Sequence, residues 1–208
     1  MPPVVLLAGG ERRLAAAYAG VFSATTVRSV LYASYEALAA TATVTPHLPL
    51  LAERFAAERL DALAHTAGSD AEPRVLFVCT ANSGRSQLAA ALFNRHAQGG
   101  ARAWSAGTAP GPEVEAAVLA SLAELGIDAG EAFPKPITDE VVAAADVVIT
   151  LGCLDALPLV AGRRYADWPV ADPGGGLAET VRGIRDEIDT RVTALLTDLR
   201  TSTPAPPR

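Results

Sequence analysis

Cysteine is scarce in this chain, which has Cys79 and Cys153 as the two cysteines among its 208 residues. Their surroundings are dissimilar, so they indicate functional thiols of a cytosolic protein rather than the disulfide framework of a secreted domain. Long apolar runs are also missing. No stretch approaches the roughly 18 consecutive apolar residues of a membrane span, and the apolar start lacks the basic residues of a secretory signal. We therefore expect a cytoplasmic protein that does not enter a membrane.

A surplus of positive charge is missing as well. The formal net charge is −6, which argues against a general binder of nucleic acid or of anionic membranes. Between residues 11 and 66, five arginines are balanced by four glutamates and one aspartate, unlike the basic docking face of a DNA reader. His47, His65 and His96 have no Cys, Asp or Glu partner at metal-ligand spacing, so no metal site is predicted.

What the chain does have is a large apolar content, with hydrophobic residues making up 50% of it. Turn-forming residues over 65–74 mark a boundary. Before it, helical spacing predicts a helix over 11–22, a second from Ser23 or Thr25 to about residue 42, and a third that ends near residue 66. We interpret these as a three-helix bundle that forms an N-terminal domain over residues 1–70 and offers a surface for a homodimer.

After the boundary, strand and helix patterns alternate, which predicts an α/β fold with a four-stranded parallel sheet flanked by helices. This domain is expected over residues 71–201, followed by a disordered Pro-rich tail over 202–208. In such sheets ligands bind at the carboxyl ends of the strands, which both cysteines follow. The expected strands are 74–78, 102–108, 146–151 and 163–168, and the expected helices are 86–97, 111–126, 138–145 and 177–200.

The junction "VCTANSGRSQ" (78–87) places Cys79 after a buried strand and before a helix. Unpaired backbone N–H groups and the helix dipole there favour the thiolate over the thiol. Arg85 offers a planar, charged fork to a tetrahedral oxyanion, and Ser86 is placed to donate to the Cys79 sulfur. We therefore expect an oxyanion-binding loop whose amides point inward, made of Thr80, Ala81, Asn82, Ser83, Gly84, Arg85 and Ser86.

This loop resembles the phosphate-binding loop of the low-molecular-weight protein tyrosine phosphatase superfamily, and "NSGRSQ" is most similar to its arsenate reductases. "SAGT" (105–108), "FPKPITDEVVAAADVVITLGC" (133–153) and "RRYADWPVADPGG" (163–175) extend the resemblance. The helical N-terminal segment is similar to that of some actinobacterial-type members. The resemblance implies that Cys79 is the nucleophile, that Arg85 clamps the oxyanion and that Asp172 protonates the leaving oxygen.

Arsenate and phosphate are both tetrahedral oxyanions, so the loop alone does not choose between reductase and phosphatase. The family's phosphatases carry a tyrosine after the "DP" pair, where this chain has Gly174, and Gln87 follows the reductase pattern. Both features favour an arsenate reductase that converts arsenate to arsenite. Two alternatives stay open: a low-molecular-weight phosphatase that hydrolyses phosphomonoesters, and a non-catalytic regulator that binds an oxyanion.

A reductase needs further thiols. Actinobacterial-type relatives resemble "GCGDxCP" where this chain reads "GCLDALP", so Cys153 is kept and Leu157 replaces a second thiol. No bound cofactor is expected. The thiol co-substrate is either mycothiol with mycoredoxin, or thioredoxin acting after Cys153 resolves Cys79, although Cys153 is equally well explained as a buried apolar residue. The acidic residue that binds potassium in some relatives corresponds to Ala90, and Lys135 is expected to be an exposed loop charge.

Overall fold

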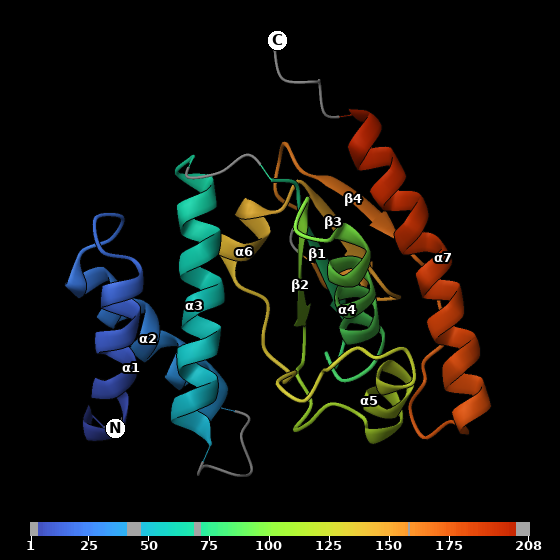
Figure 1. Ribbon diagram of the computed structural model, residues 1–208, viewed down its shortest axis with the longest axis horizontal. Helices are drawn as coiled ribbons and strands as arrows, with labels where there is room; N and C mark the ends of the chain where they lie inside the picture. The colour runs from blue at the N-terminus through green and yellow to red at the C-terminus, as the bar shows by residue number, and fades with distance from the viewer. Residues whose placement is uncertain (1–3, 41–46, 69–71, 158, 203–208) are drawn as a thin grey trace.

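The computed structural model describes residues 4–40, 47–68, 72–157 and 159–202. The N-terminal part contains the three predicted helices, α1 (Val4–Ala17), α2 (Ala24–Ala39) and α3 (Leu48–Thr66), which pack around an apolar cluster of their own (Figure 1). Ser23 caps α2, because its Oγ accepts a hydrogen bond from the Thr26 N–H at 3.1 Å. The expected bundle is confirmed.

The first helix begins earlier than expected, at Val4 rather than near residue 11. Gly9 and Gly10, which precede the expected start, both lie inside α1. Gly10 is buried, and a Cβ built on it would lie 2.8 Å from Glu53 Oε2 of α3. The absence of a side chain at Gly10 therefore leaves room for the Glu53 side chain of α3.

The second part contains the predicted sheet of four parallel strands in the order β2-β1-β3-β4. The strands β1 and β3 read as continuous apolar runs and are buried along their whole length, as expected for the centre of a parallel sheet. The carboxyl ends of all four strands lie at one edge of the sheet, which is where a ligand site is expected. Their bounds are β1 (Arg74–Cys79), β2 (Arg102–Gly107), β3 (Val147–Thr150) and β4 (Arg164–Asp167).

Helices cover both faces of this sheet (Figure 1). One face packs against α4 (Arg85–Ala97), α5 (Ala116–Ala123) and α7 (Ala178–Ser202). The other face packs against α6 (Asp139–Ala144) and against α3, whose Ala62 joins the same apolar cluster as Leu76 and Val148. The N-terminal bundle therefore supplies part of the covering layer of the sheet.

The helix expected over 111–126 is shorter in the structure, where α5 begins at Ala116. The residues before it bond to the oxyanion loop instead of forming a helical turn. Gly111 donates its N–H to Ala81 O at 2.8 Å, and Glu115 donates its N–H to Ser83 O at 3.0 Å. Tertiary hydrogen bonds thus replace the local ones that the sequence pattern favoured.

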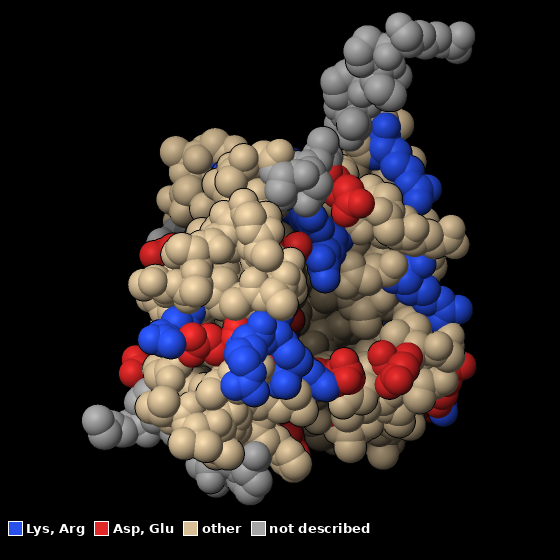
Figure 2. All heavy atoms as spheres, turned by 60° about the vertical axis from the view of Figure 1, so that its left-hand side comes forward, with Lys and Arg blue, Asp and Glu red and all other residues tan. Residues whose placement is uncertain are grey.

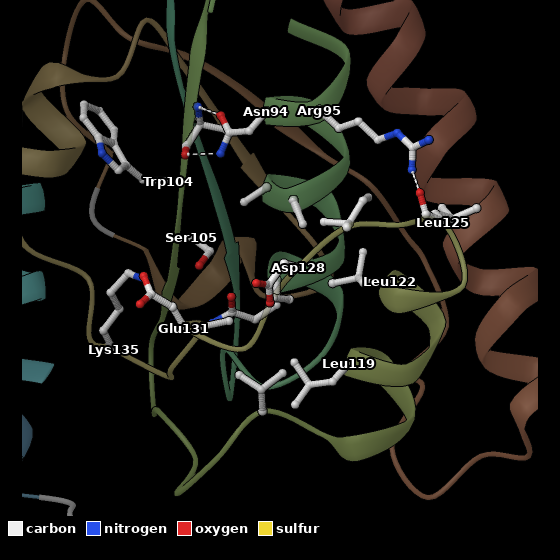
Figure 3. A pocket seen from close by; sticks show the side chains of 18 of the residues that line it. Asn94, Arg95, Trp104, Ser105, Leu119, Leu122, Leu125, Asp128, Glu131 and Lys135 are labelled. Atoms are coloured by element: carbon white, nitrogen blue, oxygen red, sulfur yellow. Dashed lines mark hydrogen bonds between the residues drawn. The ribbon is translucent and has the colours of Figure 1, made fainter. Parts of the chain in front are cut away.

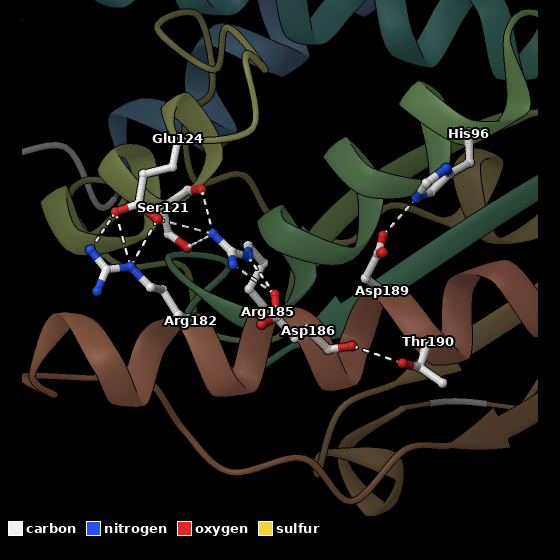
Figure 4. Close-up of polar contacts among 8 residues, drawn as sticks. All are labelled: His96, Ser121, Glu124, Arg182, Arg185, Asp186, Asp189 and Thr190. Carbon is white, nitrogen blue, oxygen red and sulfur yellow. Dashed lines mark hydrogen bonds and ion pairs between the residues drawn. The ribbon is translucent and has the colours of Figure 1, made fainter.

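Polar contacts fix α7 to the sheet-covering helices (Figure 4). Arg185 is 7% exposed and donates from Nη1 to Ser121 O and to Glu124 Oε2, both at 3.1 Å. Farther along α7, Asp189 Oδ1 lies 2.6 Å from Nε2 of His96 at the end of α4. These contacts hold α7 to α5 and to α4, the helix that follows the oxyanion loop. The Pro-rich tail from residue 203 onward lies outside the described residues.

Ion pairs line the contact between α3 and the α/β part. Asp61 Oδ2 lies 2.8 Å from Arg102 Nη1 of β2, and Arg59 is paired with Glu140 of α6. On the face of the molecule that Figure 2 shows, positively and negatively charged side chains lie next to one another, as they do in these ion pairs. No helix in the described parts of the chain is long and apolar enough to cross a membrane.

Candidate oxyanion site

The site is built around Cys79, the last residue of β1, which is 2% exposed. Its Sγ accepts a hydrogen bond from the Asn82 N–H at 3.2 Å, so the loop curls back over the sulfur. Ser86 Oγ lies 3.0 Å from the same sulfur and accepts from Asn82 Nδ2 at 2.8 Å. Because the Ser86 hydroxyl oxygen accepts from Asn82, its proton is free to point at the sulfur.

Two residues of the loop need special backbone or space. Asn82 has a φ of 50° and is fully buried, and its Oδ1 accepts from the backbone N–H of Lys135 at 3.0 Å. Asparagine is among the few residues that tolerate this left-handed conformation. At Gly84 the requirement is space, because a Cβ there would lie 2.7 Å from Pro173 Cγ. The loop after β4 therefore rests directly on the oxyanion loop.

That contact brings Asp172 to Arg85, although 87 positions separate them in the sequence. Arg85 Nη2 donates to Asp172 Oδ2 at 2.6 Å, and Arg85 Nη1 donates to Val170 O at 3.3 Å. The second carboxylate oxygen of Asp172 accepts from the Gly174 N–H at 3.0 Å. The Asp172 side chain is 61% exposed, so the carboxyl group stands at the mouth of the site, where a leaving group would depart.

Sequence reasoning missed a second carboxylate at this mouth. The Oε1 of Glu115 lies 3.1 Å from the position of a Cβ on Gly84 and 3.9 Å from that on Gly174. Burial raises the pKa of Glu115, the charge of Asp172 raises it further, and the Arg85 guanidinium opposes both. No local signal marks Glu115, because its place depends on the backbone contact between residues 115 and 83.

Cys153 lies in a different environment from Cys79. It follows β3 and belongs to the apolar cluster on the α3 and α6 face of the sheet, together with Leu157. Its thiol is 8% exposed and lies 3.5 Å from Val78 O. Burial raises the pKa of Cys153, a backbone hydrogen bond at Leu151 opposes this, and the charge of Cys79 raises it again.

The expectation for Lys135 was wrong, because this side chain is 6% exposed rather than free in a loop. Its Nζ lies 3.3 Å from Glu58 Oε1 of α3 and 4.6 Å from the centre of the Phe133 ring. A carboxylate from the N-terminal bundle thus compensates the buried ammonium. Local sequence patterns do not reveal this ion pair, since its members are 77 positions apart.

A cavity of about 620 Å³ lies behind the oxyanion loop and contains neither Cys79 nor Asp172 in its wall. It is bounded by α4, β2 and the segment from 125 to 135, with Lys135 in its wall (Figure 3). Glu58 of α3 also lines it. Ala90 also lines it. Within the described ranges, no three His, Cys, Asp or Glu side chains are grouped so as to hold a metal ion.

Known proteins with similar sequences and structures include arsenate reductases and phosphatases. A solved structure of a thioredoxin-dependent arsenate reductase from Corynebacterium glutamicum is 42% identical, covers 96% of this chain and 98% of its own, and has a TM-score of 0.84. A glutaredoxin arsenate reductase of Synechocystis sp. is 33% identical over 59% of this chain and 95% of its own length. A protein-arginine-phosphatase of Geobacillus stearothermophilus is also 33% identical, over 62% of this chain and 97% of its own length.

Family models account for both parts of the chain. Residues 7–64 match the protein-tyrosine-phosphatase-like N-terminal domain, which corresponds to the helical bundle. Residues 74–205 match the low molecular weight phosphotyrosine protein phosphatase model, which corresponds to the sheet, the oxyanion loop and the helices around them. On the strength of that match and of the loop geometry, the chain belongs to the low molecular weight phosphotyrosine protein phosphatase family.

Proposed function

We propose that this protein is an arsenate reductase that uses Cys79 as its nucleophile. The observation that carries the proposal is the convergence of Cys79, Arg85 and Asp172 on one loop, in a chain that is similar over 96% of its length to an arsenate reductase. The loop amides and Arg85 hold the oxyanion, and Asp172 supplies a proton at the exposed mouth. These roles are complementary and need no bound cofactor.

The first step joins Cys79 to arsenic. The thiolate attacks arsenate, a sulfur–arsenic bond forms, and one arsenic–oxygen bond breaks as Asp172 protonates the departing oxygen, which leaves as water. Arg85 must release Asp172 in part to bind the oxyanion, because its Nη2 donates to the Asp172 carboxylate at 2.6 Å. The oxyanion and Asp172 thus share one cation, which places the acid next to the substrate.

The second step reduces arsenic. A thiolate attacks the Cys79 sulfur, a disulfide forms, and the electron pair of the broken sulfur–arsenic bond stays on arsenic, which leaves as arsenite. We propose that an external thiol, mycothiol or a redoxin, supplies the attacking sulfur. Supporting this is the environment of Cys153, whose burial and raised pKa disfavour the thiolate that an internal attack requires. A redoxin then reduces the disulfide.

The test supplies arsenate with mycothiol and mycoredoxin, or with thioredoxin and its reductase, and follows the consumption of reductant. We expect saturable, arsenate-dependent consumption with one of these systems and competitive inhibition by phosphate. Turnover of p-nitrophenyl phosphate with no arsenate-dependent consumption would instead identify a phosphatase. That second candidate function is supported by the similarity to the protein-arginine-phosphatase.

A regulator that binds an oxyanion without turnover is the remaining alternative. It has no need of a carboxylic acid at the mouth of the site, so the position of Asp172 argues against it. Tight binding of phosphate or arsenate, with no turnover in any thiol system, would favour it.

We further propose that the protein acts in the cytoplasm, with an N-terminal domain over residues 1–70 and an α/β domain over 71–201. The bundle is the candidate surface for a homodimer, supported by the exposed side chains of Val4, Val5 and Leu6 on α1. Light scattering on the full chain and on a Val5→Glu variant tests the dimer. A dimer that the substitution dissociates supports it, and a monomer at all concentrations contradicts it.

A further inference from the structure

Lys135 is the chain's single lysine, and it lies at the junction between the N-terminal bundle and the oxyanion loop. Its ammonium group is buried and lies 3.3 Å from the Glu58 carboxylate of α3. A buried ammonium without a counter-charge carries a large desolvation penalty, so the position of Lys135 depends on Glu58. Phe133, two residues earlier, is buried in the apolar cluster of the N-terminal bundle.

The backbone of this same segment holds the oxyanion loop. The N–H of Lys135 donates to Asn82 Oδ1 at 3.0 Å. Gln87 Nε2 lies 3.1 Å from Phe133 O and 3.0 Å from Asn82 O, and so joins the segment to the loop a second time. Asn82 has a left-handed backbone conformation. Its N–H donates to the Cys79 sulfur, and its side-chain amide donates to the Ser86 hydroxyl, which lies against the same sulfur.

A continuous chain of contacts therefore runs from α3 to the sulfur of Cys79. It passes from the Glu58 carboxylate to Lys135, from the backbone of Lys135 to the Asn82 amide, and from Asn82 to Cys79. A left-handed asparagine persists where surrounding contacts over-determine it. The 133–135 segment supplies one of these contacts directly, from the Lys135 N–H, and supports a second through Gln87, which bonds to both Phe133 O and Asn82 O. Displacing that segment would release the loop amide that points at the sulfur.

We propose that Glu58 is a positioning residue for the oxyanion site, through which the N-terminal bundle holds the loop in its anion-binding shape. The bundle is then a working part of the site that acts through the 133–135 segment. The inference deepens the proposed function, because the oxyanion that the loop holds is arsenate in that reaction. Binding of phosphate and alkylation of Cys79 report on the same loop without any arsenate turnover.

The test is Glu58→Gln, which keeps the size of the side chain and removes its charge. The matched control is Glu140→Gln, which breaks the ion pair with Arg59 one position along α3 at the same interface. The 16% exposed side chain of Glu140 is at least as buried as that of Glu58, at 28%, and its ion pair leads to α6 rather than to the loop. The measurements are the dissociation constant for inorganic phosphate, the rate of Cys79 alkylation by iodoacetamide in a Cys153→Ser background, and KM and kcat for arsenate.

We expect Glu58→Gln to weaken phosphate binding and to raise KM for arsenate by about tenfold, and to slow alkylation, because a small displacement of a binding loop is costly. Glu140→Gln should change the dissociation constant for phosphate by less than about twofold, even when it lowers the melting temperature by as much as Glu58→Gln does. Equal weakening in both variants would overturn the proposal, since it would indicate general loosening of the interface. Unchanged phosphate binding in Glu58→Gln would overturn it as well.

A charge exchange gives a second, independent test. The double variant Glu58→Lys with Lys135→Glu restores an ion pair of opposite polarity, so phosphate binding should recover at least threefold relative to Glu58→Lys alone. Absence of recovery in a double variant that folds and melts cooperatively would contradict the positioning role. If arsenate reduction fails in the unmodified protein while phosphate binding responds as expected, the proposed function falls and the positioning role stands.

Discussion

The two thiols of this protein lie at the carboxyl ends of neighbouring strands and are both buried, but they belong to apolar clusters on opposite faces of the sheet and have different polar contacts. Cys79 ends β1 and accepts a hydrogen bond from a backbone N–H of the loop that follows it. Cys153 comes after β3, packs into the apolar cluster on the opposite face and has a raised pKa. In the proposed mechanism, the polar contacts of the Cys79 sulfur with the Asn82 N–H and the Ser86 hydroxyl, rather than its strand position, distinguish it from Cys153.

The largest effect is expected at Cys79. The Cys79→Ser substitution should lower arsenate reduction by about a thousandfold or more, because a serine hydroxyl is a far weaker nucleophile and cannot form the disulfide. Reductant consumption under saturating arsenate measures the effect. Serine should leave phosphate binding within about threefold, since the loop amides and Arg85 remain. A variant with full turnover would remove Cys79 from the mechanism.

The next largest effect is expected at Asp172. Asp172→Asn keeps the shape of the side chain and removes its proton, so kcat should fall by about a hundredfold. The same change removes the carboxylate that lies 2.6 Å from Arg85, so phosphate should bind at least as tightly as before. This split between kcat and binding is the signature of a leaving-group acid. A loss of binding without a loss of kcat would assign Asp172 a different role.

A smaller effect is expected at Cys153, and it tests the comparison of the two thiols directly. With mycothiol and mycoredoxin as the reducing system, Cys153→Ser should change turnover less than about threefold, because an external thiol does the resolving. A stability cost of about 1–2 kcal/mol is expected from a hydroxyl in an apolar cluster. A hundredfold loss of turnover in a folded variant would show that the buried thiol resolves Cys79.

The smallest effect is expected at Glu115 and concerns stability. A carboxyl group whose folded pKa is raised contributes stability below its unfolded pKa and loses that contribution as the pH rises through the folded value. At pH 7 the charged Glu115 therefore costs stability, and Glu115→Gln should raise the melting temperature by less than about 4 °C. Thermal unfolding at pH 7 and pH 4 measures this, and the gain should shrink at pH 4. A rise in melting temperature that is larger at pH 4 than at pH 7 would contradict a raised pKa for Glu115.

The strands and the oxyanion loop could be predicted from the sequence because their signals are local. These signals are the continuous apolar runs of β1 and β3 and the junction of a strand, a small-residue loop and a helix at Cys79. Each of them spans no more than about twenty residues. Asp172 was predicted from a resemblance of motifs, since nothing in its own neighbourhood indicates Arg85 as a partner.

The rest of the site depends on contacts between distant parts of the chain, which sequence periodicity does not encode. Lys135 is buried because Glu58 of the N-terminal bundle faces it, and Glu115 reaches the mouth because its backbone bonds to Ser83. In each case a tertiary contact overrides the local pattern.

The most direct test of the central claim is a mass measurement on one turnover. The reduced protein is mixed with arsenate and the thiol, quenched with an alkylating agent and digested, and the state of each cysteine is read from its peptide. We predict an arsenate-dependent disulfide that contains Cys79, with Cys153 alkylated as a free thiol. Arsenite formation with Cys79 still free and alkylated would contradict the account.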